Sequence, residues 1–136
     1  MAEEKTLDME GVAQDAAEAE RVAEEAKQEQ ETGSYTHTFK NPFPWKGKTY
    51  ETLTFDWTAL NGGDHLEIES EIVMKGRTLV SPAFTGDFLA GMAARACTER
   101  DEKGKRVIDG WAIKEMPLTD FQAITRKARG FLLRAE

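Results

Sequence analysis

The chain has 136 residues and a mass of 15.2 kDa, which is the size of one domain. Charged residues make up 32% and apolar residues 40% of the sequence, as in soluble globular proteins. The longest apolar runs are three or four residues, whereas a membrane-spanning helix needs about 20. The acidic N-terminus has no secretory or transit-peptide pattern, and the single cysteine, Cys97, excludes an internal disulfide. We therefore expect a cytosolic protein.

The negative charge lies almost entirely in the N-terminal segment. Residues 1–31 contain 11 acids and 3 bases, a net charge of −8, whereas residues 32–136 contain 14 acids and 15 bases, a net charge of +1. The segment is rich in helix formers, but its apolar stripe consists of Val12 and alanines, which bury little area. We predict an acidic arm over residues 1–34, either a frayed helix or disordered, with docking on a partner or sister subunit as the alternative. Residues 35–136 form the folded domain.

The domain begins with a pattern typical of a β-hairpin. Residues 35–40 and 52–57 each alternate between apolar or aromatic and polar side chains. Between them lie Pro42, Pro44 and a turn at residues 46–48, and the prolines restrict the first strand to an edge. A lone hairpin is marginal in water, so helices or a second subunit must cover it.

Three helices are expected after the hairpin. The first spans about 62–75 with Asn61 as its cap and an apolar face of Leu66, Ile68, Ile72 and Val73. The second spans about 86–100 with a core-facing stripe that includes Leu89 and Cys97. Residues 107–117 are expected to be a connector with packed Trp111, Ile113 and Met116. The third helix begins after Pro117, where residues 119–122 match a capping box, and its stripe runs from Leu118 to Leu132. The predicted fold class is α+β, a hairpin packed on about three helices.

The sequence contains no pattern that indicates catalysis or a cofactor. His37 and His65 belong to no metal-binding motif, and Cys97 is expected to be a small buried apolar residue. Glu67, Glu69 and Glu71 are expected on the solvated surface of a helix, and no phosphate-binding glycine motif is present. We expect no cofactor, no metal and no enzymatic activity.

Basic residues gather near the C-terminus, at Arg126, Lys127, Arg129 and Arg134. They favour the dipole of a helix C-terminus, or they form a contact surface for an acidic partner. The positive excess is too small to favour nucleic-acid binding.

Several segments together resemble the Mu-type phage tail assembly chaperones. These are YTHTFKNPFPWKGKTYETLTFDW (residues 35–57), LEIESE, PAFTGDFLAGMAARAC and PLTDFQAITRKARGFLL. The resemblance covers roughly residues 35–134, and the acidic arm lies outside it. It implies a non-enzymatic protein of the host bacterial cytoplasm that binds the aggregation-prone tail tape-measure protein during tail morphogenesis and is absent from the mature virion.

The family supplies no binding residues that transfer position by position, so the candidates rest on physical arguments. Phe43 and Trp45, held near the hairpin turn by prolines, are predicted to be exposed and to contact a partner. Arg126, Lys127 and Arg129 are the second candidate set. The predicted partner is the tape-measure protein, with a homo-oligomer as a further expectation and no membrane contact. The alternatives are a structural tail or baseplate subunit and a small nucleic-acid-binding regulator.

Overall fold

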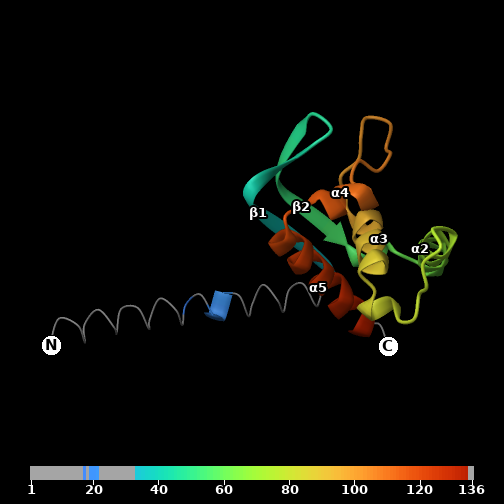
Figure 1. The fold of residues 1–136 in the computed structure, drawn as a ribbon. Coiled ribbons are helices and arrows are strands. Elements are labelled where there is room, and N and C mark those ends of the chain that lie inside the picture. Colours follow the sequence, from blue (N-terminus) through green and yellow to red (C-terminus); the bar gives the residue numbers. More distant parts are fainter. Residues whose placement is uncertain (1–16, 18, 22–32, 135–136) are drawn as a thin grey trace, which may run out of the picture. The chain divides into compact units, whose positions relative to one another are not determined.

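The computed structural model describes residues 17, 19–21 and 33–134 (Figure 1). Contacts along the chain divide it into two units, Met1–Thr32 and Gly33–Glu136. Residues 17 and 19–21 are helical, and the rest of the predicted arm through residue 32 lies outside the described residues. The folded unit is an α+β arrangement, a two-stranded antiparallel hairpin followed by helices, which confirms the predicted fold class.

The hairpin consists of β1 (Ser34–Trp45) and β2 (Lys48–Asp56), joined by a two-residue turn. Lys46 and Gly47 both have positive φ, 47° and 81°, the combination that suits the right-handed twist of a tight hairpin. Pairing is regular from Ser34 to Thr38 and again from Phe43 to Trp45, with an irregularity between them. The strands are therefore longer than the two alternating segments predicted, because pairing resumes beyond Pro42.

One face of the hairpin is buried. It carries His37, Phe39 and Phe43 from β1 and Leu53 and Phe55 from β2. Helix α5 (Leu118–Arg134) contacts β1, and α3 (Gly86–Ala96) contacts β2. The predicted need for helices to cover the hairpin is met within the chain.

Helix α3 lies at the centre of the fold. It contacts α2 (Gly62–Met74), α4 (Gly110–Glu115) and α5, and α2 lies on the far side of α3 from the hairpin (Figure 1). Two short 3-10 turns, Trp57–Ala59 and Pro82–Phe84, lead into α2 and α3. The largest fully buried side chains form one core: Phe55, Phe88, Leu53, Leu89, Ile108, Ile113, Ile124 and Cys97.

The boundaries of α2 agree with local sequence signals. The Asn61 side chain accepts a hydrogen bond from the Asp64 backbone N–H at 3.0 Å, and the Asp64 carboxylate accepts one from the Asn61 N–H at 2.9 Å. This reciprocal pair satisfies two helix-start donors. The helix ends at Met74, and Gly76 has a φ of 77°, as helix-terminating glycines commonly do.

Other helix predictions need correction. Helix α3 stops at Ala96 rather than near Arg100, because Cys97 turns extended and pairs with Phe55, and the Thr98 N–H donates to the Thr54 carbonyl. The predicted connector at 107–117 contains α4, which Asp109 caps by accepting from the Ala112 N–H at 2.9 Å. None of the described helices has both the length and the apolar character that a membrane span requires.

Four apolar residues predicted to pack inside are exposed: Leu66, Val73, Trp111 and Leu118. Ile68, Ile72, Ile113 and Met116 are buried as predicted. The error at α2 has a geometric cause. One neighbouring helix covers only the side that carries Ile68 and Ile72, so the other apolar side chains of α2 face solvent.

Candidate functional site

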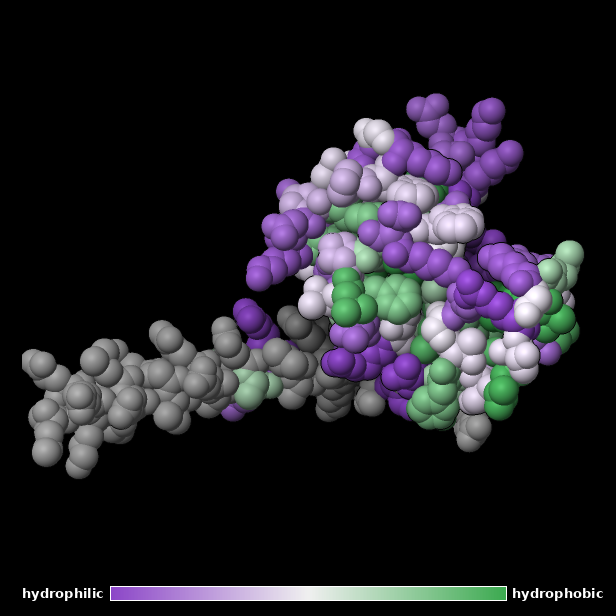
Figure 2. Space-filling view, in the orientation of Figure 1, coloured by the Kyte–Doolittle hydropathy of each residue, from purple (hydrophilic) through white to green (hydrophobic). Residues whose placement is uncertain are grey.

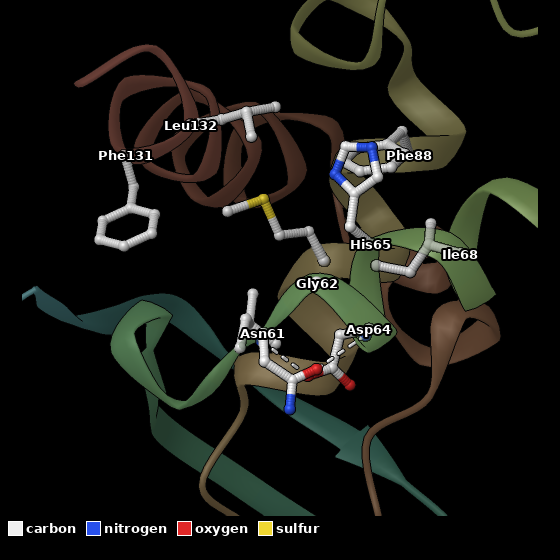
Figure 3. A pocket seen from close by; sticks show the side chains of 10 residues that line it. Asn61, Gly62, Asp64, His65, Ile68, Phe88, Phe131 and Leu132 are labelled. Atoms are coloured by element: carbon white, nitrogen blue, oxygen red, sulfur yellow. Dashed lines mark hydrogen bonds between the residues drawn. The ribbon is translucent and has the colours of Figure 1, made fainter. Parts of the chain in front are cut away.

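A groove of about 340 Å³ lies between the start of α2, α3 and the end of α5. Figure 3 shows Phe131 and Leu132 on the α5 side and His65, Ile68 and Phe88 on the opposite side. The His65 and Phe88 ring centroids are 4.7 Å apart. Apolar side chains dominate the lining, and polar groups enter only from the start of α2. A groove of this kind suits an apolar side chain of a partner.

Arg95 of α3 links this helix to α2 beside the groove by ion pairs. The Arg95 guanidinium contacts Asp64 at 3.0 Å, Glu67 at 2.6 Å and Glu71 at 3.2 Å, all from α2. Hydrogen bonding from the Asn61 backbone N–H, followed by Arg95, holds the pKa of the Asp64 carboxyl below its ordinary value, although burial acts in the opposite direction. Glu67 and Glu71 are exposed as predicted and Glu69 is half-buried, but Glu67 and Glu71 converge on Arg95, a contact the sequence did not reveal.

On the side away from α3, α2 presents an apolar surface to solvent. We call it the outer face of α2 and define it by Leu66, Val73 and Met74, which are 63%, 58% and 86% exposed. In Figure 2, hydrophobic atoms gather at the right-hand side of the molecule, where α2 lies in Figure 1. Large apolar side chains grouped on a surface often mark an interaction site.

The predicted hairpin-tip pair is not exposed as expected. Phe43 is only 5% exposed, and its ring stacks with those of Phe39 and Trp45, at centroid distances of 5.5 and 6.2 Å. Trp45 is half-buried, and its indole N–H donates to the Val107 carbonyl at 3.1 Å. The prediction of exposure is wrong for Phe43, because the strands stay paired up to the turn and fold over the core. The pair does line a shallow groove with Pro117, and its role in partner binding stays a prediction.

The three basic candidates on α5 do not form one surface. Arg126 is exposed, whereas the Lys127 ammonium lies 5.3 Å from the Tyr35 ring centroid. The Arg129 guanidinium donates to the Ala83 carbonyl at 2.8 Å and lies over the Phe84 ring. Arg129 therefore joins α5 to the turn before α3. Lys127 contacts β1 at Tyr35, near the start of the strand, whereas Phe43 and Trp45 lie at its other end.

Sequence reasoning missed a buried polar chain between the hairpin and α5. The Tyr35 hydroxyl lies 2.7 Å from Nδ1 of His37, and Nε2 of His37 lies 2.7 Å from Oδ1 of Asp120. A carboxylate only accepts, so Nε2–H donates to Asp120, and Nδ1 of a neutral imidazole accepts the Tyr35 hydroxyl. His37 and Asp120 are both buried. They link β1 to α5 across 83 residues of sequence, a separation over which local pattern carries no signal.

The described residues offer no grouping of three histidine, cysteine or acidic side chains that could hold a metal ion. Cys97 is buried as predicted, and burial raises the pKa of its thiol, which disfavours the reactive thiolate. Comparison of the chain with protein-family models, with curated proteins and with solved structures gives no match.

Proposed function

We propose that this protein is a phage or prophage tail assembly chaperone. It binds the tail tape-measure protein in the host bacterial cytoplasm, keeps it soluble during tail morphogenesis, and is absent from the mature virion. The proposal rests first on the resemblance of residues 35–134 to the Mu-type chaperones. The α+β architecture of the folded unit is compatible with that resemblance.

One structural observation supports the proposal most strongly. The start of α2 lines the apolar groove of about 340 Å³, and the opposite side of the same helix exposes Leu66, Val73 and Met74. Each of the two surfaces can take apolar side chains of a client helix. A protein that covers apolar stripes of a long helical client needs this kind of surface.

Co-expression with the tape-measure protein encoded in the same phage genome tests the proposal. We expect the tape-measure protein to move from the insoluble to the soluble fraction and to co-purify with this chain. A matched control is Leu89→Asp, which places a charge in the core and removes the folded surface. A tape-measure protein that remains insoluble would contradict the proposal. Stoichiometric amounts of this chain in purified tails would instead favour the structural tail or baseplate subunit.

A further inference from the structure

Helix α2 carries apolar side chains on two sides. Ile68 and Ile72 are buried and face the core. Leu66 and Val73 are seven residues apart, which is about two turns at roughly 100° per residue, so they lie on one line along the helix. That line is roughly 130° around the helix from Ile68 and Ile72. The solvent side of α2 therefore carries two large apolar side chains on one line, with the exposed Ser70 between them.

Acidic side chains border the outer face of α2 on both sides. The helix contains four acids, Asp64, Glu67, Glu69 and Glu71, and no lysine or arginine. Glu69 lies on one flank with His65, 3.6 Å away, and Glu67 and Glu71 lie on the other. Three of the four carboxylates share Arg95, whose side chain is only 13% exposed. Lys75, which follows the helix, is turned toward Trp111 instead. Arg106 also lies 3.9 Å from Asp64, so two arginines offset the four carboxylates only in part, and the flanks keep a negative excess next to exposed apolar groups.

Exposed apolar side chains between acidic flanks favour a partner that is apolar along its centre and basic along its edges. We propose that the outer face of α2 docks an amphipathic helix whose apolar stripe is bordered by lysine or arginine. Opposite charges on the flanks fix the register of such a helix and exclude acidic ones. A symmetric contact with α2 of a second copy would place carboxylates against carboxylates, which disfavours that occupant. The assignment of this helix to the tape-measure protein rests on the function proposed above, whereas its chemistry does not.

Two synthetic peptides provide the test on the full chain. Both carry the same leucine stripe on an alanine helix, with lysine flanks in one and glutamate flanks in the other, and binding is followed by fluorescence anisotropy. We expect the lysine peptide to bind about tenfold or more tightly than the glutamate peptide, and to lose affinity between about 50 and about 500 mM salt. Equal binding of the two peptides, or no binding of either, would overturn the proposal.

Variants locate the binding, because the acidic N-terminal segment attracts lysine equally in all of them. Leu66→Ser with Val73→Ser should weaken binding of the lysine peptide by about tenfold or more, since two apolar contacts are lost. Glu69→Lys should weaken it by several-fold. The matched controls are Val80→Ser with Leu118→Ser, both exposed, and Glu115→Lys. Each control should keep the wild-type affinity, and thermal melting should show that all variants fold.

The possible failures can be told apart. If Leu66→Ser with Val73→Ser binds the lysine peptide like wild type, the docking proposal is wrong. It is also wrong if the same variant changes only self-association measured by light scattering, because a second copy then covers the face. If the tape-measure protein is solubilised equally by wild type and by this variant, the proposed function stands and docking on α2 does not. If the peptide results hold but the tape-measure protein remains insoluble, the docking stands and the proposed function fails.

Discussion

Three polar side chains are buried among the described residues, and two of them, His37 and Asp120, contact each other; the third is Thr125. Asp120 is 7% and His37 6% exposed, and their side chains meet at 2.7 Å. Among the described residues, no buried side-chain nitrogen or oxygen lacks a hydrogen-bond partner. Each partner is tolerated inside only because the other is present.

Removal of both partners should therefore cost less than the sum of removing each one alone. We predict that Asp120→Ala lowers the free energy of unfolding by about 2–4 kcal/mol, because it leaves the imidazole buried with one hydrogen bond fewer. His37→Leu with Asp120→Leu should cost less than the sum of the two single leucine changes. Urea denaturation at neutral pH measures each difference. Additive losses would show that the pair does not act as a unit.

At the level of elements, local signals predicted the starts and turns but not the contacts between elements. The Lys46–Gly47 turn, the Asn61 cap and the start of α5 after Pro117 follow from residues close in sequence. Helix α4 was missed because six residues show too little periodicity to separate a helix from a connector. The residues at 119–122 match a capping box with Thr119 as the N-cap, yet α5 already begins at Leu118, so Thr119 lies inside the helix. The bond from Asp120 to His37 joins α5 to β1, and no local pattern indicates it.

The contact between α2 and α3 depends on a glycine. A Cβ added at Gly91 would lie 2.9 Å from Cγ2 of Ile68, a buried side chain, whereas one at Gly86 would meet nothing within 4 Å. We predict that Gly91→Ala lowers the free energy of unfolding by about 1–2 kcal/mol, the cost of overpacking less the gain in helix propensity. Gly86→Ala should be neutral or stabilising. Chemical denaturation of the two variants makes the comparison, and equal midpoints would show that α2 moves aside freely.

Asp87 of α3 forms ion pairs with Lys114 of α4 and with Arg77, which follows α2. Hydrogen bonding from Lys114 of α4, followed by Arg77, holds the pKa of the Asp87 carboxyl below its ordinary value, although burial opposes the shift. A lowered folded-state pKa stabilises the protein above the ordinary pKa, and the contribution disappears as the pH falls through the folded value. Asp87→Asn should therefore be less stable than wild type at neutral pH, and the difference should shrink as the pH falls below about 4.

Thermal melting of wild type and Asp87→Asn across this pH range checks the prediction. Lys114→Met provides the control, because it removes one of the two cations that contact Asp87, the one at 2.9 Å, and should reduce the stability gap between aspartate and asparagine at position 87. A gap that widens toward acid pH would contradict the sign of the predicted linkage.

In the molecule as a whole, some large apolar side chains are buried in the core and others are exposed to solvent, and residue type alone does not separate the two groups. Phe43 belongs to the core that joins the hairpin to the helices, whereas Leu66, Val73 and Phe84 face solvent. Sequence patterns predict Phe43 at the surface and Leu66 and Val73 in the interior. Periodicity identifies an apolar face, but it does not say which neighbour covers that face.

A matched pair of phenylalanines tests this division. Phe43 is 5% and Phe84 70% exposed. We predict that Phe43→Ala lowers the free energy of unfolding by about 3–5 kcal/mol, as for other large-to-small core changes. Phe84→Ala should change it by only about 0.5 kcal/mol, because its ring already contacts water. Guanidinium denaturation of both variants gives the comparison. If Phe43→Ala melts like wild type, the hairpin tip is not part of the core, and Phe43 and Trp45 become the leading candidates for partner contact.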